Sequence, residues 1–263
     1  MDLGLKNKVA LVLASSKGLG KAAAMALANE GCRLAVCGRD PKTLNAAAKE
    51  IKRITGAPVL AEAMDVENKR ARERMIGKIL KRYGGIDILV TNSGGPVPGK
   101  SLELPDREWP KAVSSTLMVA VDWTRAVAPV MMKKRWGRII HILSISVKQP
   151  IDGLILSNTM RAGAAGFAKT TATELAPHGI LVNALCPGLF LTGRLEELIE
   201  RRRKQSGRRR AEEAERMASE IPLGRIGRPE ELGSVIAFLA SERASFITGA
   251  VLQVDGGLYR GLL

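Results

Sequence analysis

Residues 9–20 read VALVLASSKGLG, an apolar run that passes through a short polar turn into two closely spaced glycines. The apolar run has the branched residues of a buried strand, and an alanine-rich helical stretch follows it. Gly18 and Gly20 permit a tight turn and a close approach of the backbone, and the start of the helix presents unpaired N–H groups to a ligand. This strand, turn and helix start predict a binding site for the pyrophosphate of a dinucleotide.

The same alternation of strand and helix continues along the chain. Runs rich in branched apolar residues predict seven strands, over 9–15, 33–39, 58–65, 87–93, 138–144, 180–187 and 250–255. Helices are expected over 19–30, 41–54, 67–82, 106–132, 157–176 and 229–241. Because strands and helices alternate, the strands should pair in parallel through right-handed crossovers. We expect an α/β fold, a Rossmann-like doubly wound seven-stranded parallel sheet with helices on both faces.

Length and composition are those of an ordinary folded protein, with 263 residues, 46% of them hydrophobic and 25% charged. No linker or repeat divides the chain, so we expect a single domain over residues 1–263. Residues 188–222 fit neither the strand nor the helix pattern, and they follow the sixth expected strand. Ligands bind beyond the carboxyl ends of the strands in such sheets, so this stretch is expected to form a lid over the site.

The net charge of +15 is compatible with a polyanionic partner, and the placement of the charges decides against one. Seven cations lie within residues 201–210 with no acid among them, but glutamates flank this segment on both sides. The pattern indicates a solvated, salt-bridged helical segment, and no aromatic residue is interleaved to stack on bases. We therefore expect no nucleic-acid partner.

Membrane and metal functions are also not expected. No apolar run approaches the roughly 18 residues that a membrane-spanning helix needs, and residues 1–8 carry no cleavable hydrophobic signal. We expect a cytoplasmic protein with no membrane partner. Cys32, Cys37 and Cys186 have neither metal-ligand nor redox spacing, so we expect buried thiols and no metal site.

Five motifs, in order along nearly the whole chain, resemble those of the short-chain dehydrogenase/reductase family. They are the glycine segment 13–20, with Leu13 and Ala14 in place of the family's Thr and first Gly; Asp65-Val66; Thr91-Asn92-Ser93-Gly94; Pro187-Gly188 with Thr192; and Asp255-Gly256-Gly257. The resemblance implies an oxidoreductase that transfers a hydride between a nicotinamide dinucleotide and a small-molecule carbonyl or alcohol. It also implies a homotetramer, and the small residues at 162–166 would permit close packing of subunits.

The choice of cofactor depends on the end of the second strand, where an acid would hold the ribose of NAD and a base would pair with the 2′-phosphate of NADP. This strand ends at Arg39, and Lys17 adds a second cation in the glycine turn. Asp40 precedes Pro41 and is expected to cap the next helix instead. We therefore expect NADP, with NAD less favoured. The expected cofactor-binding residues are Ser15, Ser16, Lys17, Gly18, Leu19, Gly20, Arg39, Asp65, Val66, Asn92, Gly94, Arg161, Pro187, Gly188 and Thr192.

The catalytic positions depart from the family, in which a Tyr donates the proton and a Lys follows it four residues later. Ser144 matches the family's serine, but Ser157 stands in the place of the Tyr and Arg161 in that of the Lys. Thr116 stands where an Asn is expected. A serine hydroxyl is far less acidic than a phenol, and an arginine stays protonated. The expected catalytic residues are Ser144, Ser157 and Arg161, in a modified scheme.

Other ionisable side chains are less favoured. Tyr83 precedes the fourth strand at its wrong end, and Tyr259 lies in the carboxy-terminal tail, which could reach a neighbouring subunit. Lys148 and Asp152 lie in the loop between Ser144 and Ser157, where each could face the substrate or be solvated. His141 is expected to pack in the core.

Two function classes remain open. The first is an NADP(H)-dependent enzyme that interconverts a carbonyl and a secondary alcohol, in which the two serines orient the oxygen, the arginine supplies positive charge and water relays the proton. The alternative is a dinucleotide-binding member without hydride transfer, which would serve as a sensor or assembly subunit. The cofactor motifs fit both, and the catalytic substitutions separate them.

Overall fold

A seven-stranded sheet runs through the middle of the computed structural model, which describes residues 1–262. Neighbouring strands all pair in parallel, in the order β3-β2-β1-β4-β5-β6-β7. The strands are β1 (Val9–Val12), β2 (Arg33–Gly38), β3 (Val59–Ala63), β4 (Ile88–Thr91), β5 (Gly137–Ile142), β6 (Ile180–Pro187) and β7 (Val251–Val254). The expected Rossmann-like α/β fold is confirmed. Most strands end earlier than expected, because the residues that follow them form the turns at the carboxyl edge.

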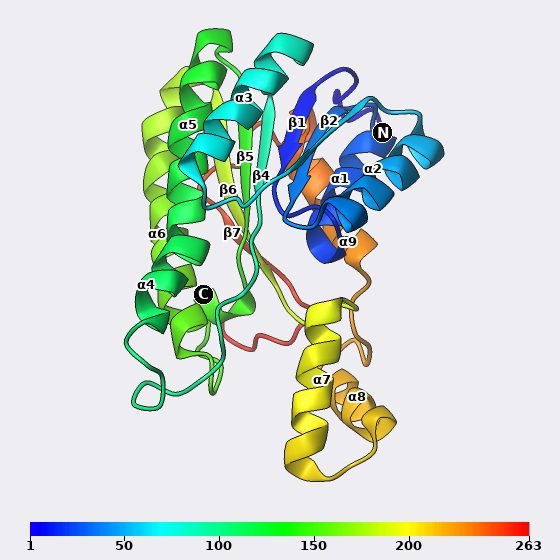
Figure 1. The fold of residues 1–263 in the computed structure, drawn as a ribbon, viewed down its shortest axis with the longest axis vertical. Coiled ribbons are helices and arrows are strands. Elements are labelled where there is room, and N and C mark those ends of the chain that lie inside the picture. The colour runs from blue at the N-terminus through cyan, green and yellow to red at the C-terminus, as the bar shows by residue number, and fades with distance from the viewer. Residues whose placement is uncertain (263) are drawn as a thin grey trace.

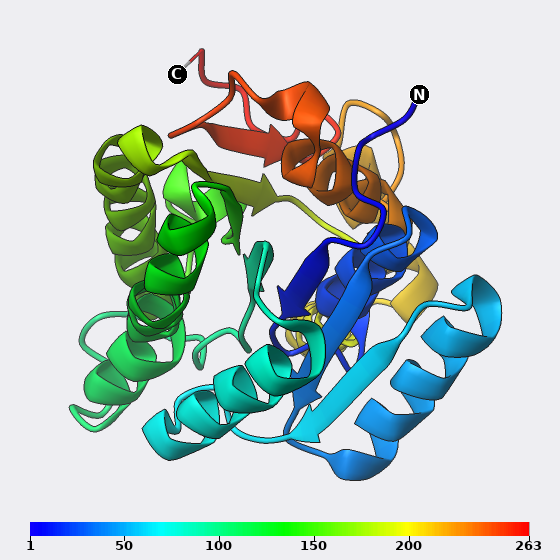
Figure 2. The same ribbon diagram turned by 90° about the horizontal axis from the view of Figure 1, so that it is seen from above.

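Helices cover both faces of the sheet (Figure 1, Figure 2). The helices are α1 (Gly18–Asn29), α2 (Pro41–Thr55), α3 (Lys69–Tyr83), α4 (Glu108–Ala112), α5 (Val119–Lys134), α6 (Ile155–Leu175), α7 (Gly193–Ser206), α8 (Arg210–Ser219) and α9 (Pro229–Ala240). One long helix was expected over 106–132, and this is wrong in detail. A π-helical stretch, Val113–Met118, separates α4 from α5 there.

The core has two layers, one on each face of the sheet. Alternate residues of β1 face opposite layers, as the two-residue period of a strand requires. Val12 packs with Leu27 of α1 in one layer, and Leu11 packs with Trp123 of α5 in the other. The three cysteines are free and buried, as expected, and burial raises the pKa of the Cys37 thiol to about 12.

Residues 188–222, which fitted neither pattern as a whole, contain the two helices α7 and α8, which form a helical hairpin, and the helical segment expected from the charge pattern lies within them. Figure 1 shows the hairpin extending from the body of the protein beyond the carboxyl ends of the strands. It has its own small apolar cluster, built around Leu195, Ile199 and Met217. Leu195, Leu198 and Ile199 form a narrow apolar stripe at i, i+3 and i+4, and the many charges around it hide this helical signal.

The charged segment of the hairpin is salt-bridged, as the sequence predicts. The ion pairs are Arg202–Glu220, Arg203–Glu200, Lys204–Glu200, Arg208–Glu213, Arg209–Glu212 and Arg210–Glu196. Most of these cations are therefore partnered by the flanking glutamates within the hairpin.

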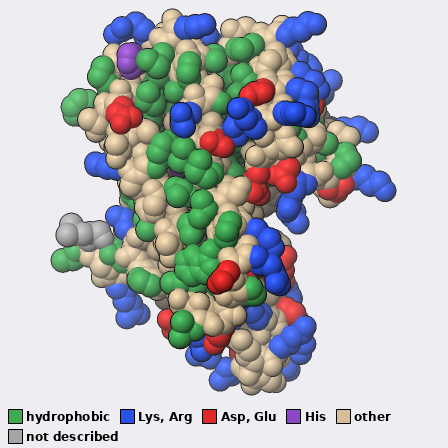
Figure 3. Space-filling view, turned by 60° about the vertical axis from the view of Figure 1, so that its left-hand side comes forward, with side chains coloured by type: hydrophobic (Ala, Val, Ile, Leu, Met, Phe, Trp, Pro, Cys, Tyr) green, Lys and Arg blue, Asp and Glu red, His purple; other side chains and the backbone are tan. Residues whose placement is uncertain are grey.

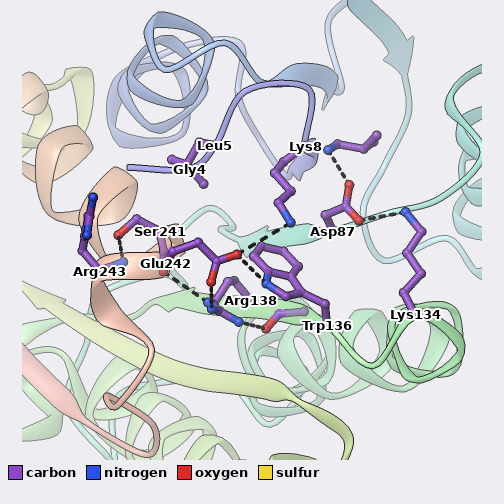
Figure 4. Close-up of polar contacts among 12 residues, drawn as sticks. Gly4, Leu5, Lys8, Asp87, Lys134, Trp136, Arg138, Ser241, Glu242 and Arg243 are labelled. Carbon is purple, nitrogen blue, oxygen red and sulfur yellow. Dashed lines mark hydrogen bonds and ion pairs between the residues drawn. The ribbon is translucent and has the colours of Figure 1, made fainter. Parts of the chain in front are cut away.

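A polar cluster joins β5 to the turn after α9 at the amino edge of the sheet, opposite the carboxyl ends of the strands (Figure 4). The indole N–H of Trp136 donates to Glu242 Oε1 over 2.9 Å. Lys8 Nζ lies 3.6 Å from the centre of the Trp136 ring, and the Arg138 guanidinium lies 4.4 Å from it. This cluster stabilises the edge of the sheet that is remote from the expected site.

Candidate active site

The glycine turn after β1 is held by close backbone contacts. Gly18 has a φ of +58°, in the left-handed region that favours glycine, and it begins α1. A Cβ on Gly20 would collide with the Ala14 carbonyl oxygen, so no larger residue fits there. Asn92, just after β4, donates through Nδ2 to the same carbonyl oxygen over 3.3 Å. Asn92 therefore positions the turn.

The first turn of α1 has no side-chain cap. Lys17, at the N-cap, has an extended backbone, its side chain makes no capping hydrogen bond, and no acid lies in the first turn. The N–H groups at this helix start are therefore available to an anion, and the positive end of the helix dipole favours one. This geometry fits the pyrophosphate of a dinucleotide.

Lys17 and Arg39, the two cations expected to bind the 2′-phosphate of NADP, are both exposed. Neither forms an ion pair with any of residues 1–262. A Cβ on Gly38, at the end of β2, would lie 3.1 Å from Ser16 Oγ, so the glycine turn and the end of β2 are in contact. Lys17 follows Ser16 and Arg39 follows Gly38, which brings the two cations to the same end of the sheet. Asp40 accepts hydrogen bonds from the N–H groups of residues 42 and 43, each over 3.2 Å, as the expected cap of α2.

Several of the expected cofactor-binding residues turn a hydroxyl, an apolar side chain or a carbonyl group toward the interior of the protein. The Ser15 hydroxyl is fully buried, donates to the Val12 carbonyl over 2.9 Å and accepts from the Cys37 N–H over 3.2 Å. The side chain of Leu19 packs against the core. The Val66 carbonyl accepts from the Trp123 indole over 2.9 Å. These groups shape the wall of the site.

The remaining cofactor candidates line the carboxyl edge. Asp65 is exposed just after β3, and no heavy atom lies within 4 Å of a Cβ built on Gly94. Pro187 ends β6, and a Cβ on Gly188 would lie 2.7 Å from the Asp255 Cβ, so the segments after β6 and β7 approach closely.

Thr192 links the segment after β6 to the glycine turn. Its methyl carbon lies 3.5 Å from a Cβ built on Gly18, although the two residues are far apart in the sequence. Its hydroxyl accepts a hydrogen bond from the Leu195 N–H over 3.4 Å and so caps α7. The base of the hairpin therefore lies beside the expected pyrophosphate site.

Two of the three expected catalytic residues are in direct contact. Arg161 Nε donates to Ser157 Oγ over 3.2 Å, and both residues lie on α6. Ser157 Oγ is also 3.4 Å from Ser146 Oγ, and either hydroxyl could donate. Ser144 Oγ accepts from the Ser146 N–H over 3.1 Å, so Ser144 joins the group through Ser146. Four side chains thus meet at the carboxyl end of β5.

Arg161 is held against the backbone that follows β5. Its Nη1 donates to the Leu143 carbonyl over 2.7 Å and to the Ile142 carbonyl over 3.4 Å. Within residues 1–262 its Nη2 makes no hydrogen bond, so one side of the fork is available to a ligand. Burial lowers the pKa of the Arg161 guanidinium to about 10, and the group therefore stays charged at neutral pH.

Thr116 lies in the π-helical stretch between α4 and α5, a feature often found at functional sites. Its side chain is buried, and its hydroxyl has no hydrogen-bond partner in the described part of the chain. An unpaired buried hydroxyl is uncommon in folded proteins.

The less favoured ionisable residues lie in different places. Tyr83 is at the opposite edge, where its hydroxyl donates to the Leu34 carbonyl over 3.3 Å. Tyr259 follows β7, and its N–H donates to Asp255. Lys148 is half-buried and Asp152 is exposed.

His141 is buried in the core as expected. Its Nδ1 lies 2.7 Å from the Thr91 hydroxyl, and its ring packs edge-on to Phe167. Burial lowers the pKa of the His141 imidazole to about 4.

Two structural absences concern residues 1–262 alone. Their His, Cys, Asp and Glu side chains form no group of three or more that could hold a metal ion. Their helices include none with the length and apolar composition needed to cross a membrane.

Sequence reasoning missed two polar residues of the site. Ser146 touches Ser157, and its position two residues after Ser144 was the available signal. Arg194, in the first turn of α7, donates through Nη2 to the Pro96 carbonyl over 3.2 Å. The arginine-rich segment 201–210 drew attention away from this more isolated arginine.

Known proteins resemble the chain over nearly its whole length. The family model described as Enoyl-(Acyl carrier protein) reductase matches residues 13–259. The 3-oxoacyl-[acyl-carrier-protein] reductase FabG of Aquifex aeolicus is 34% identical over 262 residues, covering 98% of this chain and 100% of that protein. Dehydrogenase/reductase SDR family member 4 of Homo sapiens is 34% identical over 254 residues, covering 96% of this chain and 88% of that protein.

A solved structure agrees with these relatives. L-sorbose reductase from Gluconobacter frateurii, complexed with NADPH and L-sorbose, matches with a TM-score of 0.95 and 34% identity. The match covers 100% of both chains.

Proposed function

Because the chain belongs to the short-chain dehydrogenase/reductase family of oxidoreductases, we propose that it is an NADP(H)-dependent enzyme that interconverts a carbonyl group and a secondary alcohol. The observation that carries this proposal is the hydrogen-bonded group of Ser146, Ser157 and Arg161 at the carboxyl end of β5. This group lies on the edge of the sheet that also carries the glycine turn, where a nicotinamide ring and a substrate oxygen would meet.

The cofactor is NADP(H). Lys17 and Arg39 are free to pair with a 2′-phosphate, whereas both oxygens of Asp40 accept hydrogen bonds that cap α2. The N–H groups at the start of α1 would hold the pyrophosphate, and Arg161 and Thr192 lie on the nicotinamide side. The NADPH in the related L-sorbose reductase supports this choice. Bound NADPH supplies the hydride.

The serines and the arginine would hold the substrate oxygen. Ser157 Oγ accepts from Arg161, so its own proton points elsewhere, toward Ser146 or toward a substrate. The Ser144 hydroxyl and Arg161 Nη2 supply further donors. A cation with several hydrogen-bond donors stabilises the negative charge that develops on a carbonyl oxygen, and such stabilisation often contributes most to catalysis. Because a serine is a poor acid, the proton comes from water.

A second candidate reaction is reduction of a carbon–carbon double bond conjugated to a carbonyl. The observation that favours it is the serine at position 157, which leaves the site with donors and a cation but no phenol. Hydride addition to the β-carbon produces an enolate, whose oxygen Ser144, Ser157 and Arg161 would stabilise without protonating it, and the α-carbon then takes a proton from water. The description of the matching family model, an enoyl reductase, names this class of reaction.

The alternative of a dinucleotide-binding member without hydride transfer is less favoured, because the relatives compared above are reductases by name. The decisive experiment is to follow NADPH oxidation by the purified protein with diketones, ketoacyl thioesters, aldoses, quinones and conjugated enones. Turnover above background with any of them supports the enzyme. Tight NADPH binding with no turnover across all of them would favour the binding protein.

The assembly, location and moving parts are further elements of the proposal. The enzyme is a cytoplasmic homotetramer, residues 1–263 act as one catalytic domain, and residues 188–222 act as a lid. Ala162, Gly163 and Gly166 are exposed on α6, and hydrophobic side chains gather on the face that comes forward in Figure 3. Amide exchange within residues 188–222 should slow when NADPH is added. An unchanged exchange rate there would refute the lid.

A further inference from the structure

Arg194 connects the helical hairpin to the loop after β4 across the mouth of the site. Its Nη2 donates to the Pro96 carbonyl over 3.2 Å, and a Cβ built on Gly95 would lie 3.5 Å from the same nitrogen. The two residues of this hydrogen bond are 98 positions apart in the sequence. The arginine therefore lies between the base of the hairpin and the loop, and the glycine at position 95 leaves room beside it.

This arginine also acts on the catalytic group electrostatically. Its charge is close enough to lower the pKa of the Arg161 guanidinium, an effect that adds to the larger effect of burial. Two like charges near one another are unfavourable unless an anion separates them. No carboxylate among residues 1–262 forms an ion pair with Arg161, and Arg194 pairs only with Glu197 on its own helix, over 3.4 Å.

Lys148 is a third cation near this group. Lys148 follows the short helical turn that begins beyond Ser144, and it forms no ion pair within residues 1–262. Its charge acts to lower the pKa of the neighbouring Cys186 thiol, although burial keeps that pKa near 11. Lys148 is therefore near the end of β6, which carries Cys186.

The nearby acid does not balance these cations. Asp255 influences the Cys186 thiol, but its two oxygens accept from the N–H groups of Gly257 and Tyr259, each over 2.9 Å. Asp255 and Glu197, the partner of Arg194, are thus two carboxylates beside the three cations Arg161, Arg194 and Lys148, and these five groups together carry a net positive charge. Such a site attracts an anionic ligand and orients it.

We propose that Arg194, assisted by Lys148, binds an anionic group on the substrate, so that the enzyme acts on carbonyl compounds that carry a carboxylate or a phosphate. This inference rests on the proposed function, because it names the substrate class of the same site. Arg161 and the serines hold the reacting oxygen, while Arg194 determines which molecules are positioned there. When a substrate binds, Arg194 would either break its hydrogen bond to the Pro96 carbonyl or keep that bond while contacting the anionic group.

Matched pairs of compounds test the proposal. Pyruvate, acetoacetate and levulinate are each compared with their methyl esters, and dihydroxyacetone phosphate is compared with dihydroxyacetone. The acid and phosphate arms distinguish the two anionic groups. The wild type, Arg194→Met, Lys148→Met and Arg194→Lys are measured for kcat/KM. Binding of the same compounds to the NADP⁺ complex is measured by saturation-transfer NMR, which does not require turnover.

The matched control is Arg202→Met. Arg202 lies on the same helix as Arg194, and its replacement by Met removes the same positive charge. In the wild type Arg202 pairs with Glu220, away from the site. We expect at least one anionic compound to exceed its neutral partner by about tenfold or more in the wild type and in the control. Arg194→Met should remove most of this preference, and Arg194→Lys should keep part of it. Lys148→Met should reduce it.

The outcomes separate this inference from the proposed function. Equal turnover of the anionic and neutral compounds overturns the inference and leaves the reductase intact. Binding of the anions that Arg194→Met abolishes, without turnover by any variant, supports the inference and counts against the reductase. Absence of both turnover and binding for every anion overturns the inference. The inference is also overturned if Arg194→Met loses affinity for NADPH but keeps the wild-type preference for anionic over neutral compounds. Arg194 would then bind the cofactor and not the substrate.

Discussion

Arg161 Nε donates to Ser157 Oγ over 3.2 Å, one helical turn away on α6. At these two positions the chain has a serine in place of the family's tyrosine and an arginine in place of its lysine. The hydrogen bond shows that the two changed side chains interact directly. Because the serine oxygen is occupied as an acceptor, its proton is directed toward the other hydroxyls and the substrate. The pair therefore behaves as a donor group with a permanent positive charge rather than as an acid.

This arrangement predicts that Ser157 and Arg161 act as a unit. Ser157→Ala and Arg161→Met should each lower kcat for the best substrate by about a hundredfold, because each removes stabilisation of the oxyanion. The double variant should lose little more than either single one. Ser144→Ala should lower the same kcat by about tenfold. Thr159→Ala, exposed on the same helix, is the control; single losses that simply multiply would contradict a shared role.

The reverse exchange tests the departure from the family. Ser157→Tyr with Arg161→Lys restores a phenol and a lysine four residues apart, with Ser144 in place. This variant should raise turnover of at least one diketone, because a phenol can donate the proton directly. NADPH binding is measured alongside turnover. A variant that binds NADPH but stays inactive would show that more than these two side chains separates this site from its relatives.

Cofactor preference should depend on Arg39. The wild type is expected to bind NADPH at least about tenfold more tightly than NADH, since a charge-assisted contact to phosphate is worth roughly 1.5–3 kcal/mol. Arg39→Asp should narrow or invert the preference, as measured by titration of both cofactors. Arg53→Asp, an exposed arginine at the end of α2, makes the same charge change elsewhere. A wild type that prefers NADH would reject the assignment.

Backbone strain at Ala14 should be measurable. Ala14 has a φ of +46°, a left-handed conformation that is costly for any residue with a Cβ. Ala14→Gly should therefore raise the free energy of unfolding by about 0.5–1 kcal/mol, after the extra entropy of glycine in the unfolded chain. Gly56→Ala is the reciprocal test, because Gly56 has a φ of +70° and open space around its Cβ. It should destabilise by a similar amount; a destabilised Ala14→Gly beside a stabilised Gly56→Ala would refute the strain.

The fully buried imidazole of His141 should make stability depend on pH. Its folded pKa, near 4, lies below the usual 6.5 of an unfolded histidine, so the unfolded chain binds the extra proton between these values. The stabilisation is fully present above pH 6.5 and is lost as pH falls toward 4, by up to about 3 kcal/mol. Denaturant unfolding of the wild type and His141→Gln should show a weaker slope in the variant over this range. Parallel curves would exclude the histidine as the cause.

The assembly can be tested with two helical glycines. Gly166 on α6 and Gly77 on α3 both have open space around a built Cβ, so the single chain should accept a long side chain at either position. If α6 forms a subunit interface, Gly166→Arg should dissociate the tetramer and Gly77→Arg should not. Light scattering at micromolar concentration measures both. A wild type of 28.2 kDa in solution would refute the tetramer.

Local signals in the sequence determined most of the fold. The apolar runs and helical stretches identified every strand of the sheet, and the Asp40-Pro41 pair identified the cap of α2. Gly18 and Gly20 located the turn that begins α1. These features depend on conformational preferences and hydrogen bonds within a few residues, so they can be recognised without knowing the rest of the structure.

Tertiary packing decided the chemistry of the site. The contact between Ser146 and Ser157 joins a loop to α6, and the hydrogen bond from Arg194 to Pro96 joins the hairpin to the loop after β4. The Ser15 hydroxyl accepts from the Cys37 N–H of the neighbouring strand β2. Each of these contacts joins segments that are brought together in space by burial of the two apolar layers. The distance between such segments cannot be read from the linear order of the residues.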